Sequence, residues 1–159
     1  MSKQIKNKED LDFNKISEFE GPGHSPGFLL WQVSTSWRRK IETKLSEYNL
    51  THSQFVILAV LGWLTRNGDN INQAALAKYS KLDINMTSQV MRRLEKSNLI
   101  SREYIEGDER SKYAKPTKEG KKLIKKVIPV VEEVDREFFR NIDLTTRNNL
   151  LNTFRVLVK

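Results

Sequence analysis

The sequence predicts a mainly α-helical domain with one short β-hairpin. Three observations support this prediction: apolar residues recur every three or four positions over most of the chain, helix-capping residues precede these stretches, and an alternating pattern occurs only near residues 100–115. The chain of 159 residues fits a single domain by size, and its 38% hydrophobic and 30% charged residues are typical of a globular protein.

The composition excludes several classes of protein. No apolar run approaches the ~18 residues of a membrane-spanning helix, and no apolar segment follows the charged N-terminus as it would in a secretory signal. The absence of cysteine excludes a disulfide framework, a thiolate nucleophile, a zinc finger and a cysteine-based redox switch. We therefore expect a cytoplasmic protein.

The first long helix is predicted to start at Ser25 and Pro26, an N-cap followed by proline at the first helical position. An apolar stripe follows it to residue 48, and Asn49 ends the helix. Residues 1–24 are charged, end in Gly-Pro-Gly and are expected to form a flexible arm. Residues 25–159 are expected to form a single domain.

Capping residues mark the helices that follow. Thr51 and Gln54 fit a capping box ahead of a helix over residues 55–64, which is apolar nearly all round and therefore predicted to be buried. Further caps predict helices over residues 73–79 (Asn72), 83–96 (Asp83) and 117–141 (Thr117), and a last helix that starts at Leu144.

The hairpin is predicted from a change of period. Alternating residues over 100–105 and a short second strand over 111–115 flank a charged turn at residues 106–110. Two short helices followed by a charged hairpin are the order of a winged helix-turn-helix.

Positive charge is concentrated in this part of the chain. Residues 78–126 contain fourteen Lys or Arg and seven Asp or Glu, a net +7 out of the total of +8. Such a block indicates an electrostatic surface for a polyanion. A solvated lysine-rich face is the alternative, and for the five lysines between residues 118 and 126 we expect mainly a diffuse attraction to DNA.

The helix over residues 83–96 has two chemically different faces. Val90, Leu94 and Thr87 cluster on the inner side. The outer side has only hydrogen-bonding groups and no acid, with Arg93 on its flank: Asn85, Ser88, Gln89, Arg92 and Lys96. Asparagine and glutamine suit adenine and arginine suits guanine in the major groove, so Asn85, Gln89 and Arg92 are candidate base contacts.

The hairpin tip offers a second contact. Arg110 is a candidate for the minor groove, where the negative potential attracts arginine, and Asp108 can orient its guanidinium. A plain surface ion pair between the two is the alternative. Gln73 and Ser88 suit phosphate contacts better than base contacts.

Several short motifs in this order make residues 25–159 resemble the MarR family of bacterial transcription regulators. Each motif alone is weak, whereas their order and spacing together are specific. The matching stretches are residues 50–55 (LTHSQF), 71–77 (INQAALA), 86–95 (MTSQVMRRLE), 99–102 (LISR), 108–110 (DER) and 117–120 (TKEG).

The resemblance implies a homodimer that binds a pseudo-palindromic operator in double-stranded DNA. Residues 25–48 and 117–159 would form the dimerisation helices and residues 51–115 the winged DNA-binding lobe. A repressor released by a small aromatic or phenolic effector is the function expected. The candidate DNA contacts are Gln73, Asn85, Thr87, Ser88, Gln89, Arg92, Arg93, Asp108, Arg110 and Lys112, and the candidate effector contacts are Phe28, Trp31, Gln32, His52 and Phe55.

Two positions depart from the family pattern. Ala75 stands where the family often has glutamate, so the capping box with Asn72 is incomplete and a weaker helix start is expected. Pro116 stands where an apolar residue usually precedes the threonine, and it removes a backbone donor at the end of the hairpin.

Two alternative functions remain open from the sequence. A winged domain that binds only protein and a regulator without a small effector are the alternatives, and the aromatic residues proposed for the effector also suit core and dimer packing. No catalytic signature is present, and His24 and His52 have no carboxylate cluster around them, so we expect no enzyme, no metal and no cofactor.

Overall fold

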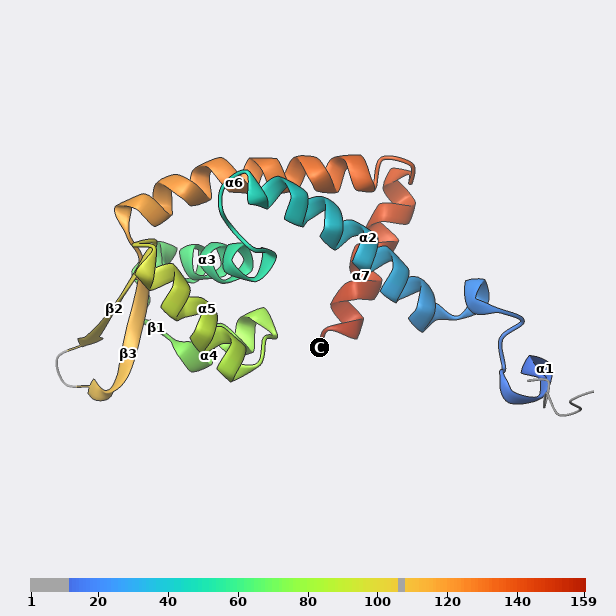
Figure 1. Cartoon of the computed structure of the whole chain (residues 1–159), viewed down its shortest axis with the longest axis horizontal. Helices are drawn as coiled ribbons and strands as arrows, with labels where there is room; N and C mark the ends of the chain where they lie inside the picture. The colour runs from blue at the N-terminus through green and yellow to red at the C-terminus, as the bar shows by residue number, and fades with distance from the viewer. Residues whose placement is uncertain (1–11, 106–107) are drawn as a thin grey trace, which may run out of the picture. The chain divides into compact units, whose positions relative to one another are not determined.

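The computed structural model describes residues 12–105 and 108–159 of the chain (Figure 1). These residues divide into two compact units, one that ends at Ser36 and one that runs from Trp37 to Lys159. The long helix α2 (Pro26–Ser46) contributes to both units.

The first unit contains short helices and the start of α2. Helix α1 (Phe13–Ile16) and the 3-10 turn η1 (Pro22–His24) precede α2. The Ser25 hydroxyl accepts a hydrogen bond from the Phe28 backbone N–H at 3.3 Å, which confirms the predicted N-cap ahead of Pro26. The side chains of this unit are mostly exposed, because it buries no apolar core of its own.

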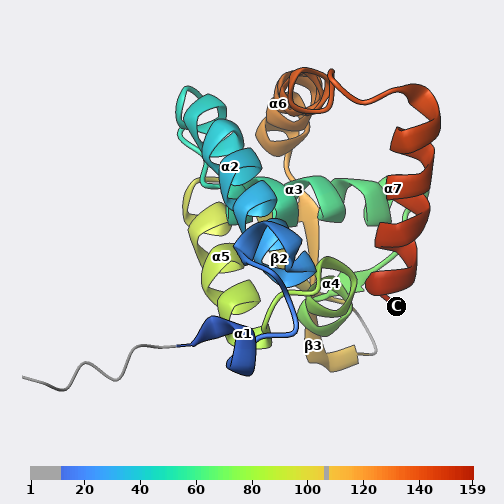
Figure 2. The same cartoon turned by 90° about the vertical axis from the view of Figure 1, so that its right-hand side faces the viewer.

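The second unit holds the remaining elements around one core. They are α3 (His52–Leu64), η2 (Thr65–Asn67), β1 (Ile71–Asn72), α4 (Gln73–Ser80), α5 (Ile84–Lys96), β2 (Ile100–Ile105), β3 (Asp108–Pro116), α6 (Lys118–Phe138) and α7 (Leu144–Leu157). Figures 1 and 2 show α3 between α6 on one side and α4 and α5 on the other. Helix α3 contacts all three of these helices and β3, so it is the central element, as its apolar sequence predicted.

The predicted capping box starts α3. The Thr51 hydroxyl accepts from the Gln54 backbone N–H at 3.3 Å, and the Gln54 side chain accepts from the Thr51 N–H at 2.9 Å. Ile57, Leu58 and Leu61 of α3 are each at most 1% exposed. The core is completed by buried residues of α2, α4, α5, β2, β3 and α6 and by Leu50 ahead of α3: Ile41, Leu45, Leu50, Leu76, Val90, Met91, Leu94, Ile100, Ala114, Val127, Val131 and Val134.

The sheet has three antiparallel strands in the order β1-β3-β2, whereas the sequence predicted only a hairpin. The missing strand, β1, pairs Ile71 with Ala114 and is too short to show a period. Strand β3 begins at Asp108 rather than at Ser111, so the turn is shorter than predicted, and the register shifts between Tyr104 and Ile105.

The last strand leads directly into α6. The Thr117 hydroxyl accepts from the Gly120 N–H at 3.0 Å and donates to the Asn98 carbonyl at 2.7 Å, which confirms the predicted cap. A Cβ atom at Gly120 would lie 2.0 Å from the carbonyl oxygen of Leu99. Only glycine at position 120 therefore lets α6 lie this close to the residue that precedes β2.

Helix α7 buries none of its residues, which it shares only with the four-residue helix α1 among the described α-helices. The Asp143 carboxylate caps it by accepting from the Thr146 N–H at 2.9 Å. Three apolar side chains of this helix, Leu151, Phe154 and Leu157, are 46%, 36% and 69% exposed. Among the described residues, no helix is long and apolar enough to cross a membrane.

Candidate nucleic-acid interface

Two caps position α4 and α5 at the surface of the second unit. The Asn72 side chain accepts from the Ala75 N–H at 2.9 Å, so α4 is capped despite the departure at position 75. Lys81 has a left-handed backbone (φ 55°) and ends α4. The Asp83 carboxylate then accepts from the N–H groups of Asn85 (2.8 Å) and Met86, and α5 starts there, as predicted.

A side-chain contact joins the starts of the two helices. The Gln73 amide donates to the carbonyl oxygen of Ile84 at 3.3 Å, across the turn from the first residue of α4 to the first residue of α5. Gln73 also lines a cavity of about 380 Å³ between the helices and the sheet, opposite Lys112 of β3. Gln73 therefore has a structural contact beside any role toward phosphate.

The outer face of α5 is polar and exposed. Asn85, Gln89, Arg92, Arg93 and Lys96 are exposed, and Ser88 is half-buried. The Ser88 hydroxyl accepts a hydrogen bond from Nη2 of Arg92 at 3.0 Å, one helical turn away. This contact holds the guanidinium over the middle of the face, where the sequence predicted a base contact.

Thr87 is a correction to the predicted site. Its side chain is 0% exposed, and its hydroxyl donates to the Asp83 carbonyl at 2.9 Å. The residue lies on the inner stripe of α5 with Val90 and Leu94, so it cannot reach a ligand outside the protein. Its role is to secure the start of α5.

Lys112, another exposed candidate for a DNA contact, lies on the wing, which is the hairpin formed by β2 and β3. Tyr104 and Lys112 are paired residues on β2 and β3, and the Lys112 ammonium lies 5.1 Å from the centre of the Tyr104 ring. Both side chains are exposed, so this cation–π contact holds the ammonium near the end of the sheet. The side chains of Asp108 and Arg110 lie outside the described residues.

An ion pair that the sequence did not predict joins α5 to the wing. Nε of Arg102 donates to Oε2 of Glu95 at 2.9 Å, and Nη2 donates to the same oxygen. The Arg102 side chain is only 18% exposed. These hydrogen bonds, more than the nearby charges, lower the pKa of Glu95 below its usual value, against a smaller opposing effect of burial.

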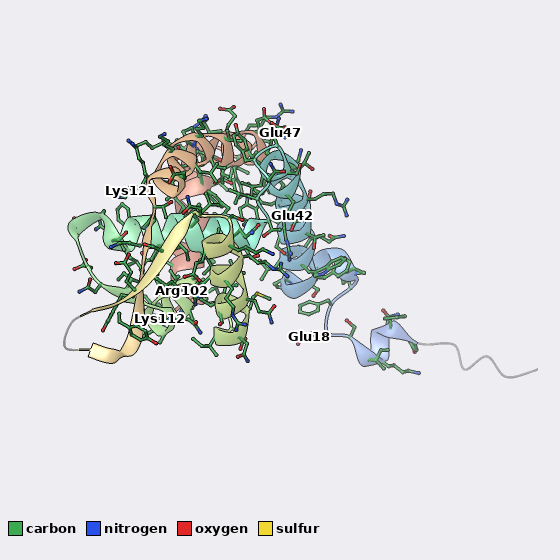
Figure 3. All side chains as sticks on the ribbon, turned by 60° about the vertical axis from the view of Figure 1, so that its left-hand side comes forward. Glu18, Glu42, Glu47, Arg102, Lys112 and Lys121 are labelled. Carbon is green, nitrogen blue, oxygen red and sulfur yellow. The ribbon has the colours of Figure 1, made fainter. Side chains whose placement is uncertain are left out.

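Glu95 is the only acid within α5, and its carboxylate is bound by Arg102 of β2. The outer face therefore stays free of negative charge, as the sequence predicted. Figure 3 shows Arg102 and Lys112 on the side of the sheet that borders α5. No local pattern links residues 95 and 102, because they belong to different elements, so only the folded chain shows the pair.

The candidate effector residues fall in both compact units. Phe28 and Trp31 stack at 5.8 Å between ring centres in the first unit, where Gln32 is also exposed. In the second unit, the His52 ring lies 5.2 Å from that of Trp37, edge to face, and Phe55 packs against the core.

Trp37 links three helices of the second unit. Its Nε1 donates to Oδ1 of Asp135 on α6 at 2.7 Å, while its ring contacts His52 at the start of α3. Burial, followed by the nearby Arg38, lowers the pKa of His52 below its usual value, and Glu42 opposes this in part. Within residues 12–105 and 108–159, no cluster of three or more His, Asp or Glu suits a metal.

The chain is similar to known regulators over nearly its whole length. The model of the MarR family matches residues 50–112. An HTH-type transcriptional regulator of Bacillus subtilis strain 168, YdcH, is 38% identical over 143 residues, which are 90% of this chain and 96% of YdcH.

Solved structures share the fold at lower identity. MepR of Staphylococcus aureus, crystallised with DNA, has a TM-score of 0.77 and 21% identity, over 84% of this chain and 96% of MepR. CouR of Rhodococcus jostii RHA1, bound to p-coumaroyl-CoA, has a TM-score of 0.77 and 21% identity, over 88% of this chain and 96% of CouR. With the match to YdcH, these results show that the chain belongs to the MarR family of DNA-binding, winged helix-turn-helix transcription regulators.

Proposed function

We propose that the protein is a sequence-specific repressor that binds double-stranded DNA as a homodimer and leaves it when a small aromatic effector binds. The single observation that carries the proposal is the outer face of α5, where Asn85, Gln89 and Arg92 are exposed side by side with no acid among them. These are the side-chain types that hydrogen-bond base edges in the major groove.

Other residues of the candidate interface have supporting roles in this proposal. Ser88 and Gln73 would contact phosphates beside the groove, and Arg93 and Lys96 would add charge at its rim. Lys112 and Arg110 of the wing would approach the neighbouring minor groove, with Asp108 orienting Arg110. The contact between Tyr104 and Lys112 supports this part because it holds the ammonium at the sheet surface.

The exposed apolar surface supports a homodimer. Helix α7 buries none of its residues. Three apolar side chains at its C-terminal end, Val156, Leu157 and the C-cap Val158, are 61–69% exposed. In the first unit, Leu30 and Trp31 are 54% and 60% exposed. Apolar surface of this extent is typical of a subunit interface. Each of two copies would then present one α5 to one half-site, ~34 Å from the other.

The effector is proposed from the family and from aromatic residues. The solved structure of CouR contains p-coumaroyl-CoA. Rings and hydrogen-bonding groups for an aromatic ligand would come from Phe28, Trp31, Gln32, His52 and Phe55. The dimer would have one state whose α5 spacing fits DNA and one whose spacing does not. A ligand that binds the second state more tightly lowers the DNA affinity, by as much as its own affinities for the two states differ. A repressor released in this way needs no covalent chemistry.

A selection of DNA fragments by the purified protein tests the proposal. Genomic fragments, starting with the region beside its own gene, are enriched on the protein and then measured in gel shifts over a salt series. We expect one retarded fragment with an inverted repeat, bound by two chains and weakened steeply by salt. No retardation at low salt would overturn the proposal in favour of a protein-binding winged domain.

The effector and the dimer need separate measurements. Light scattering after size exclusion is expected to give twice the mass of one chain, and Leu157→Asp is expected to weaken that dimer. A thermal-shift screen of phenolic acids and their thioesters should give at least one ligand that stabilises the protein and weakens the gel shift. A broad panel without such a ligand would favour a regulator that has no small effector.

A further inference from the structure

The outward face of α6 has an unusual distribution of charge. Its first nine residues include five lysines, which are all exposed, and one acid on the flank of the face. Its last turns contain four acids and a single arginine. The five lysines, called the α6 lysine patch below, are Lys118, Lys121, Lys122, Lys125 and Lys126.

The lysine patch lies opposite the buried side of the helix. Gly120, Val127 and Val131 mark the buried stripe of α6, and the helical repeat of about 100° per residue puts the patch about 180° away from it. None of the five lysines forms an ion pair or a side-chain hydrogen bond with another described residue. The patch is therefore fully available to solvent and to a partner.

This distribution does not serve the helix itself. The positive end of the helix macrodipole is at the N-terminus, where two lysines of the first turn oppose it against the one favourable acid, Glu119. In the last turn two acids oppose the negative end against the one favourable base, Arg136. The reverse order of charge would stabilise α6. The helix itself gives no reason for basic residues at its start and acidic residues at its end, whereas binding of an external partner does.

The charge density of the patch matches that of duplex DNA. Five ammonium groups span about 12 Å of helix axis, or one charge per roughly 2.5 Å. Duplex DNA has one phosphate per ~1.7 Å of its axis. Lysine binds phosphate as a point charge, and the patch has no arginine or aromatic residue, so its chemistry suits the DNA backbone without selecting a base sequence.

A membrane surface fits the patch less well than DNA. An interfacial helix needs exposed apolar side chains beside its basic ones. All of α6 is described by the structure, and none of its large apolar side chains is exposed.

The patch and the outer face of α5 lie on opposite sides of the second compact unit. Helix α3 contacts α5 on one side and α6 on the other, and Figures 1 and 2 show the three layers in that order. Figure 3 shows Lys121 where α6 begins and Lys112 further along the wing. A straight duplex that occupies the outer face of α5 therefore leaves the α6 lysine patch uncovered.

We propose that the α6 lysine patch binds the phosphate backbone of a second DNA duplex, so that the protein bridges two DNA segments while its α5 helices hold the operator. This inference rests on the proposed function for the first duplex only. The second contact is expected to be independent of sequence and strongly weakened by salt.

A capture experiment tests the bridge. The operator selected by the protein is fixed to beads and saturated with protein, and a fluorescent duplex of random sequence is added at low salt. Wild type should capture the second duplex. Lys118→Gln/Lys122→Gln/Lys125→Gln should retain the operator but capture roughly tenfold less of the second duplex. The matched control Arg39→Gln/Lys40→Gln/Arg140→Gln, three exposed cations outside the patch, should behave as wild type.

A second measurement separates failure of the bridge from failure of the proposed function. The three lysine substitutions are added to Arg92→Ala protein, and the affinity for a random duplex is measured over a salt series. The plot of log affinity against log salt should become less steep by about 3, because each lost phosphate contact contributes ~0.9 to the slope. This readout needs no operator. An unchanged slope, or equal capture by the patch variant and wild type, overturns the bridge.

Two further outcomes would also overturn it. If the patch substitutions change the oligomeric state in the absence of DNA, the patch binds a second copy of the chain, at the acidic end of its α6. Tighter binding of a single-stranded RNA competitor than of the duplex would assign it to RNA.

Discussion

Arg102 of β2 donates two hydrogen bonds to one carboxylate oxygen of Glu95, so the last turn of α5 is tied to the first strand of the wing. The guanidinium is largely buried, and it lines the same cavity as Gln73 and Lys112. The pair therefore fixes the angle between the two elements that the proposed function places in adjacent grooves.

A double-mutant cycle is expected to show this coupling. Glu95→Gln and Arg102→Gln should each destabilise the fold, with a coupling energy of about 1 kcal/mol in urea unfolding. Each should also weaken operator binding, because the wing loses its fixed angle to α5. The exposed pair of Glu103 and Lys115, joined at 2.9 Å, is the matched control and should give a smaller coupling and no change in operator affinity. Equal coupling in the two cycles would contradict the role of the Glu95–Arg102 pair.

Arg92→Ala is expected to weaken operator binding by ~1–3 kcal/mol and to relax the preference for one base pair in each half-site. Ser88→Ala should have a smaller effect in the same direction, because it removes the group that holds the guanidinium. Competition gel shifts with single-base variants of the operator measure both effects. A loss that is the same for every sequence would make Arg92 a phosphate contact instead.

Thr87→Val is expected to affect stability and not DNA recognition. The substitution keeps the shape of the buried side chain but removes its hydrogen bond to Asp83, so a loss of about 1 kcal/mol is expected in urea unfolding. The same preparation should bind the operator with unchanged sequence preference. An altered preference would return Thr87 to the DNA-contact set.

Gly120→Ala is expected to be severely destabilising, by about 3 kcal/mol or more, because the new Cβ meets the backbone carbonyl of Leu99. Gly27→Ala at the start of α2 is the control: nothing lies within 4 Å of its Cβ, so no loss of stability is expected. Thermal unfolding of the two variants measures the difference. Similar melting temperatures would show that α6 can move away from β2 at little cost.

The stability of the fold should depend on pH through His52. Its pKa is below 6.5 in the folded chain because of burial and the nearby Arg38, with Glu42 opposing, so the unfolded chain binds more protons at slightly acidic pH. Stability is fully present above pH 6.5 and is lost as the pH falls through the lower, folded pKa.

Urea unfolding of His52→Gln against wild type between neutral and mildly acidic pH measures this contribution. The variant is expected to lose the fall in stability that wild type shows in this window. His24→Gln changes an exposed histidine and should keep the wild-type fall. A wild-type profile that is flat over the window would contradict the assignment to His52.

Features that depend on near neighbours in the chain were predictable from the order of the residues. The capping groups of Ser25, Thr51, Asn72, Asp83 and Thr117 all form the predicted contacts, because a cap involves residues two to four positions apart. The same locality fixes the polar outer face of α5 and the burial of Val90 and Leu94, since both follow from the helical repeat.

Contacts between residues of different elements could be identified only in the folded chain. The two-residue strand β1 exists because β3 offers it hydrogen-bonding partners, and no period is visible in two residues. The Glu95–Arg102 pair, the contact of Gln73 with Ile84 and the chain from His52 through Trp37 to Asp135 each join different elements. The physical reason is that side-chain partners separated by a turn or by most of the chain are selected by packing, which local propensity does not encode.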